Sequence, residues 1–137
     1  FVGFIRKGFL MYVIICGSFF VYGLCFGSFF NVLVYRIPLL LKGNKITTFN
    51  ESSKCPKCNT KIKFYFNIPV LGWLILRGKC YDCKNPISVL YPFYELLWGI
   101  IFLINYILTT NLFIAITLCL LEYLFTVCLV ILKKLKK

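Results

Sequence analysis

The length of the uncharged apolar segments is the strongest constraint on how this chain can fold. No charged side chain occurs from Gly8 to Tyr35, and none occurs between Leu96 and Leu121. Hydrophobic residues make up 61% of the 137 residues, whereas soluble domains are about 45–50% apolar. A small soluble domain buries only about two thirds of its surface, so its core cannot hide this many apolar side chains. The composition therefore predicts an all-α multi-pass membrane protein.

A membrane-spanning helix needs about 20 mostly apolar residues. Residues 10–35, 87–108 and 112–132 meet this condition, so we expect three transmembrane helices. A fourth apolar run, residues 64–76, is too short to span and is expected at the membrane interface or packed under a loop. The predicted domain of residues 1–108 holds the first span, the loop 36–86 and the second span. The third span and a basic tail occupy residues 112–137.

The distribution of Lys and Arg predicts the orientation of these spans. The chain has 16 basic and 4 acidic residues, giving a net charge of +12. Ten of the basic residues lie in the loop 36–86 and four in the tail, while the turn 109–111 carries none. The positive-inside rule then places the loop and the tail in the cytoplasm. This clustering near membrane spans also argues against nucleic acid as a partner, and the lipid bilayer is the expected surrounding.

Eight cysteines fall into two sets. Four lie inside the apolar spans, where cysteine usually packs as a small apolar residue. The other four are Cys55, Cys58, Cys80 and Cys83, two C-x2-C pairs separated by 21 residues. This spacing is typical of a zinc site with four thiolate ligands.

We expect that zinc site to be structural, because four thiolates leave no open position for water or substrate. Lysines flank both pairs and offset the net negative charge of the site. A reducing cytoplasm disfavours disulfides. A redox dithiol and simple free thiols are the alternatives.

The first span and the loop carry a series of sequence motifs in a fixed order. The segment 27–38 matches the pattern G-S-F-x-N-V-x-x-x-R-x-P. The match continues, in order, through Cys55 and Cys58, residues 67–74, residues 77–80 with Cys83, Ile87-Ser88, Tyr91-Pro92 and Glu95-Leu96. In order and spacing, these motifs resemble the N-terminal domain of type IV prepilin peptidases. The resemblance covers about residues 12–108 and implies a protein of the bacterial inner membrane.

This resemblance implies a bifunctional enzyme. Such enzymes cut the leader from type IV prepilins or pseudopilins and then methylate the new N-terminus with S-adenosylmethionine. The family links its N-terminal domain to substrate binding and methyl transfer. By resemblance, Gly78 is a candidate methyl-transfer residue, although we favour a role in the turn before Cys80. No Gly-rich loop of the usual kind is present to bind S-adenosylmethionine.

The family's peptidase uses two aspartates, one of them in a GxGD motif, and an aspartic mechanism needs two carboxylates that share a proton. This sequence has one aspartate, Asp82, inside a C-x2-C pair, and no GxGD. We therefore expect no catalytic peptidase residue in this chain. It is expected to be a truncated product, a frameshifted gene or one half of a split enzyme with a separately encoded C-terminal peptidase half. The alternative is a non-catalytic zinc-binding membrane module that binds a pilin or an assembly partner.

Five polar residues in or beside the spans carry individual expectations. Ser28 and Asn31 are expected to bond between helices, with contact to substrate or methyl donor as the alternative. Arg36 is expected to anchor the first span at the headgroups. Glu95 is expected to bond to loop backbone. Glu122 lies about midway along its span, where a charge costs about 3 kcal/mol, so it needs a proton or a polar neighbour.

Overall fold

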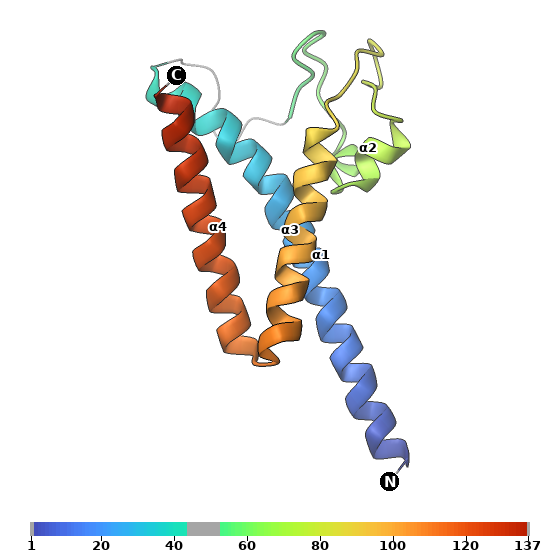
Figure 1. Ribbon diagram of the computed structural model, residues 1–137. Helices are drawn as coiled ribbons and strands as arrows, with labels where there is room; N and C mark the ends of the chain where they lie inside the picture. The colour runs from blue at the N-terminus through green and yellow to red at the C-terminus, as the bar shows by residue number, and fades with distance from the viewer. Residues whose placement is uncertain (1, 44–52, 137) are drawn as a thin grey trace.

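The computed structural model describes the backbone of residues 2–43 and 53–136 and the side chains from Gly8 onward (Figure 1). Its elements are α1 (Val2–Leu41), the 3-10 helix η1 (Phe64–Asn67), α2 (Leu71–Ile75), α3 (Leu90–Thr109) and α4 (Leu112–Leu135). Three helical segments are long and apolar enough to cross a membrane: Gly8–Leu41, Leu90–Thr109 and Leu112–Leu135. The predicted class is confirmed, since the described residues hold three such helices and no strand.

Helix α1 is longer than the predicted span of residues 10–35, because it continues through Pro38 to Leu41. A proline inside a helix has no N–H to donate to the carbonyl four residues before it, which here is Val34. The ammonium of Lys134, near the end of α4, donates to that Val34 oxygen at 3.2 Å. The contact satisfies the carbonyl that Pro38 leaves free and joins the ends of α1 and α4.

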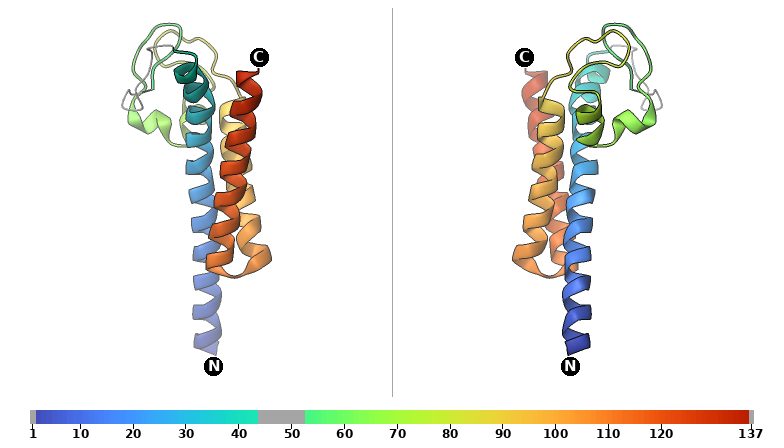
Figure 2. Two further views of the ribbon diagram at one scale, coloured as in Figure 1. Left: turned by 90° about the vertical axis from the view of Figure 1, so that its left-hand side faces the viewer. Right: turned by 90° about the vertical axis from the view of Figure 1, so that its right-hand side faces the viewer.

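Helices α3 and α4 form an antiparallel hairpin, with α1 packed alongside it (Figures 1 and 2). Thr110 in the turn adopts a left-handed conformation, and the Asn111 side chain caps α4 by accepting hydrogen bonds from the amides of Phe113 and Ile114. The loop that carries the cysteine pairs and the C-terminus lie at one end of the bundle (Figure 1). The α3–α4 turn and the N-terminus lie at the other.

Aromatic side chains fill the centre of the bundle. Trp98, Phe102 and Tyr123 are all at most 4% exposed. The Tyr123 ring meets Trp98 at a centroid distance of 4.9 Å and Phe26 at 5.0 Å, both nearly edge to face. Edge-to-face ring pairs of this kind stabilise the packing of α1, α3 and α4 beyond the effect of the buried apolar area.

Two glycines of α1 permit a close crossing with α3. A Cβ added at Gly27 would lie 2.6 Å from the Cα of Glu95, and one added at Gly23 would lie 2.7 Å from the Cα of Gly99. Both contacts are with backbone, which cannot move aside as a flexible side chain can. Gly23 and Gly27 form a G-x-x-x-G pattern, which brings membrane helices together because small residues let the backbones approach.

We predict that Gly23→Leu or Gly27→Leu separates α1 from α3 and lowers the stability of the bundle by about 2 kcal/mol or more, as overpacking does elsewhere. Thermal unfolding of the purified chain in detergent measures the effect. Gly17→Leu is the matched control, because no atom lies within 4 Å of a Cβ added there. If all three variants lost stability equally, the loss would come from replacing any glycine of α1 by leucine and not from the α1–α3 crossing.

Candidate metal centre

The first C-x2-C pair lies in a tight turn held by backbone hydrogen bonds. The Cys55 amide donates to the Thr60 carbonyl at 3.0 Å, and the Asn59 amide donates back to the Cys55 carbonyl at 2.9 Å. An antiparallel bridge between Lys54 and Lys61 closes the turn. Asn59 has a φ of 58°, a left-handed conformation that asparagine tolerates better than most residues.

The second pair repeats every one of these contacts. The Cys80 amide donates to the Asn85 carbonyl at 2.8 Å, and the Lys84 amide donates to the Cys80 carbonyl at 3.2 Å. The closing bridge joins Lys79 and Pro86, and Lys84 has a φ of 58°. We call these two turns the first and second knuckle. The same local sequence spacing thus folds twice into the same ligand-presenting turn.

The two knuckles face each other and bring all four predicted thiols together. The four sulfur atoms lie within 4.8 Å of one another. The Cys55 and Cys83 sulfurs are 3.8 Å apart, and the Cys58 and Cys80 sulfurs are 3.9 Å apart. Sulfurs at the corners of a tetrahedron around zinc, with Zn–S bonds of about 2.3 Å, are about 3.8 Å apart. The donor set therefore fits one tetrahedral Zn²⁺, and these separations are too long for disulfide bonds.

The thiols of this cluster do not ionise together by themselves. Hydrogen bonds from the Thr60 side chain and then from its backbone amide lower the pKa of Cys58 to about 6. For Cys83, the Asn85 amide favours the thiolate, but burial and the three other cysteines outweigh it and raise the pKa to about 12. A bound divalent cation would stabilise the thiolate form of all four neighbouring cysteines, so that each could lose its proton.

Asp82 links the two knuckles. Its carboxylate accepts a hydrogen bond of 2.7 Å from the Thr60 hydroxyl of the first knuckle. The only aspartate of the sequence therefore has a structural partner beside the metal ligands.

Gly78 precedes the second knuckle, with a φ of 66°. A Cβ there would lie 2.7 Å from the Trp73 ring, so both the backbone and the packing require glycine. The Trp73 indole donates to the Ile87 carbonyl at 3.1 Å, and the Ile87 amide donates to the Gly78 carbonyl at 2.7 Å. These contacts explain Gly78 by turn geometry, and its role in methyl transfer stays a prediction.

Glu95 connects the loop to the bundle. Its carboxylate accepts a hydrogen bond of 2.6 Å from the backbone amide of Val70, which confirms the expected bond to loop backbone. Val70 has a φ of 61°, an unusual conformation for a β-branched residue. The Ser28 side chain is a further hydrogen-bond partner of Glu95, and the Asn31 amide donates to the Tyr91 carbonyl at 3.2 Å. Both polar residues of α1 thus bond to α3, as expected for helix packing.

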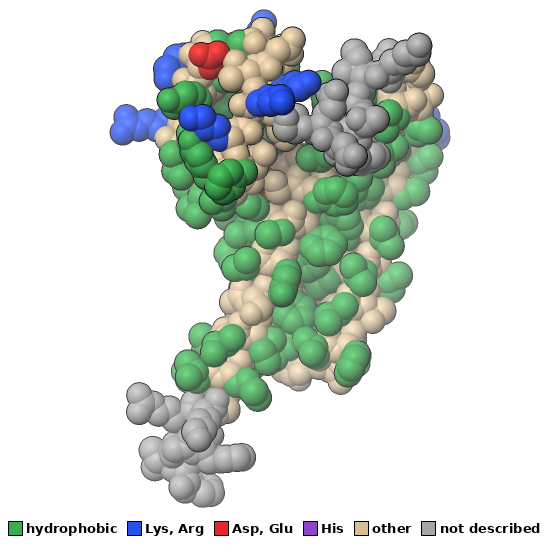
Figure 3. Space-filling model, turned by 180° about the vertical axis from the view of Figure 1, so that it is seen from behind, with side chains coloured by type: hydrophobic (Ala, Val, Ile, Leu, Met, Phe, Trp, Pro, Cys, Tyr) green, Lys and Arg blue, Asp and Glu red, His purple; other side chains and the backbone are tan. Residues whose placement is uncertain are grey.

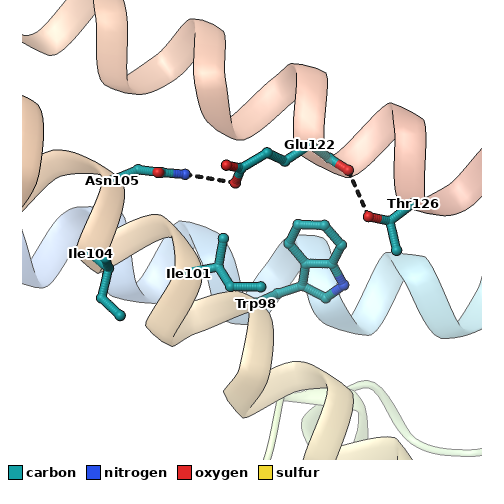
Figure 4. A pocket seen from close by; sticks show the side chains of 6 residues that line it. All are labelled: Trp98, Ile101, Ile104, Asn105, Glu122 and Thr126. Carbon is teal, nitrogen blue, oxygen red and sulfur yellow. Dashed lines mark hydrogen bonds between the residues drawn. The ribbon is translucent and has the colours of Figure 1, made fainter.

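Two other polar expectations have different outcomes. The Glu122 carboxylate accepts a hydrogen bond of 2.8 Å from the Asn105 side chain across the α3–α4 interface, so the expected polar neighbour is present (Figure 4). The pair borders a cavity of about 360 Å³ that Trp98 and Ile101 also line. Arg36 is only 8% exposed and is engaged within the protein. Its expected role as an anchor at the headgroups stays a prediction.

Three membrane-capable helices with a four-cysteine centre between the first helix and the other two define a helical membrane domain with a metal-binding loop. The family model of the bacterial peptidase A24 N-terminal domain matches residues 21–109, more than half of the chain. The chain therefore belongs to this family.

Several curated relatives share the name prepilin leader peptidase/N-methyltransferase. The one from Myxococcus xanthus is 47% identical over 83 residues, which are 61% of this chain and 23% of the relative. The one from Klebsiella pneumoniae is 43% identical over 95 residues, which are 68% of this chain and 42% of the relative. The chain thus spans less than half the length of these relatives. No solved structure matches it.

We predict that the purified chain binds one Zn²⁺ through Cys55, Cys58, Cys80 and Cys83. Any single Cys→Ser change at these positions should lower the zinc content and loosen the loop while leaving membrane insertion intact, because insertion depends on the spans. Elemental analysis and limited proteolysis measure the two effects. Cys128→Ser, an exposed position on α4, is the control. Zinc content near zero in wild-type protein prepared under reducing conditions would contradict the assignment.

Proposed function

We propose that these 137 residues form the N-terminal part of a prepilin leader peptidase/N-methyltransferase that processes type IV prepilins or pseudopilins. The family match over residues 21–109 is the observation that carries this proposal. In this proposal the 137-residue part binds the substrate and takes part in methyl transfer from S-adenosylmethionine. Zinc holds the loop in shape and takes no part in the chemistry, because its four thiolates complete the coordination shell.

In our proposal, proteolysis needs a pair of aspartates, whereas this sequence has one aspartate, Asp82. The three acidic side chains of the described part all have other partners: Asp82 binds Thr60, Glu95 binds Val70, and Glu122 binds Asn105. Glu95 lies near the start of α3, whereas Glu122 lies near the middle of α4. No two of them are placed to share a proton as an aspartic pair does. In our proposal the peptidase aspartates belong to a further segment or to a separately encoded C-terminal half.

We predict that the 137-residue chain alone does not remove the leader from a prepilin in liposomes. Adding the C-terminal peptidase segment of a relative should restore cleavage, because that segment brings the missing acids. Leader removal is read by gel shift and mass spectrometry, with the full-length Myxococcus xanthus relative as positive control. Cleavage by the chain alone that survives Asp82→Asn would refute this division of labour.

The alternative function is a zinc-binding membrane module that binds a pilin or an assembly partner without turnover. The closed four-thiolate centre favours a structural role for the loop in either case. Incubation of the reassembled halves with cleaved pilin and labelled S-adenosylmethionine separates the two. Label on the pilin N-terminus supports the enzyme, while pilin binding without label supports the module.

We infer that the protein resides in the bacterial inner membrane with both knuckles in the cytoplasm. Lys42→Cys, beside the loop, should then escape a membrane-impermeant thiol reagent on intact cells, and Thr110→Cys should react. Both positions are exposed, so access depends on the side of the membrane. Permeabilised cells, in which both must react, are the control. The reverse labelling pattern on intact cells would contradict a cytoplasmic location of the knuckles.

A further inference from the structure

A patch of large apolar side chains lies exposed on the loop, outside the three spans. Phe64 is 84% exposed, Ile75 is 62% exposed, and Leu74 is 55% exposed. We use the name loop patch for the five exposed side chains of Phe64, Ile68, Leu71, Leu74 and Ile75. Several large apolar side chains exposed on one short segment indicate contact with a membrane or a partner.

The depth of the loop patch is set by the Val70–Glu95 hydrogen bond. Glu95 is the sixth residue of α3, which begins at Leu90, so the amide of Val70 lies about 7 Å along the axis of a membrane-capable helix. Helix α2 starts at the next residue, Leu71, and extends sideways from α3 (Figures 1 and 2). The loop patch is therefore at the level where the spans enter the bilayer, in the headgroup region.

A basic cavity adjoins the loop patch. It has a volume of about 460 Å³ and lies between the end of α2 and the second knuckle. Its lining includes the cations Arg77, Lys79 and Lys84 and the apolar side chains Phe66, Ile75 and Tyr81. Ile75 belongs to both surfaces, so the apolar wall of the cavity continues into the loop patch.

The charge of this region is one-sided. Lys63 and Lys84 hold their ammonium groups 5.0 and 5.7 Å from the centre of the Tyr81 ring. Among the residues that the structure describes, no acidic side chain lines the cavity, and the nearby Asp82 is bonded to Thr60. The space-filling view shows Lys and Arg side chains around the loop end of the molecule, above the apolar surface of the helices (Figure 3).

We propose that the basic cavity holds the phosphate of an anionic phospholipid while the loop patch enters the boundary between its headgroup and acyl chains. A phospholipid is the one ligand that presents a phosphate and an apolar body at this depth. A free phosphate ion would satisfy the cations and leave the loop patch in water. The lipid site would fix the loop, and the metal centre within it, at the membrane surface. This inference is independent of whether the chain processes prepilin.

Lipid retention by the full chain tests the proposal. Native mass spectrometry in detergent, with equal amounts of phosphatidylglycerol and phosphatidylcholine, should show preferential retention of phosphatidylglycerol. Each cation near an anionic lipid surface is worth a factor of about five. The triple variant Arg77→Gln, Lys79→Gln, Lys84→Gln should therefore lose roughly 100-fold in that preference.

The matched control is Lys42→Gln, Lys133→Gln, Lys136→Gln, which removes the same charge from exposed positions at the same end of the bundle. It should leave the preference unchanged. The zinc content of each variant reports whether the knuckles remain folded. If the triple variant loses zinc, Lys63→Gln with Arg77→Gln replaces it, since neither position lies in a knuckle.

Three outcomes would overturn the proposal. Equal losses in variant and control would indicate general electrostatic attraction. Displacement of phosphatidylglycerol by excess inorganic phosphate would assign the cavity to a soluble anion. Displacement by a prepilin peptide at unchanged lipid composition would make the surface a protein-binding site.

Discussion

The close crossing of α1 and α3 is the contact on which the position of the loop and of the metal centre depends. Gly27 lets the α1 backbone approach the Cα of Glu95. Glu95 then holds the amide of Val70, at the start of α2. Helix α2 carries Trp73, whose ring covers Gly78 just before the second knuckle. A continuous series of contacts therefore runs from a glycine contact inside the membrane to the metal centre.

The metal centre unites two loop segments that are far apart in sequence. Each knuckle is stabilised by its own backbone hydrogen bonds, but few contacts other than the Thr60–Asp82 bond join the two. A metal ion with two ligands from each knuckle would supply the missing attraction. In small domains with little core such binding energy is folding energy. The loop, which has few buried apolar residues, fits this description.

The sequence has four acidic and sixteen basic residues. The three acidic side chains that the structure describes all bond within the protein. Asp82 joins the knuckles, Glu95 joins the loop to the bundle, and Glu122 joins α3 to α4. Most of the cations lie in the loop and the tail, at one end of the molecule (Figure 1). The three described acids thus join separate elements of the fold.

The sequence by itself determined the three spans, the tetracysteine ligand set and the family resemblance, because each depends on composition or spacing along the chain. The apolar length of α3 and the repeated C-x2-C spacing are local properties that need no knowledge of contacts. Only the tertiary structure decided that Gly23 and Gly27 form the helix crossing, although their G-x-x-x-G spacing was a visible signal. It also decided that Lys134 completes the hydrogen bond that Pro38 cannot make, 100 residues from Val34. Such pairings depend on how the helices cross and in which register, and hydrophobic pattern alone does not specify either.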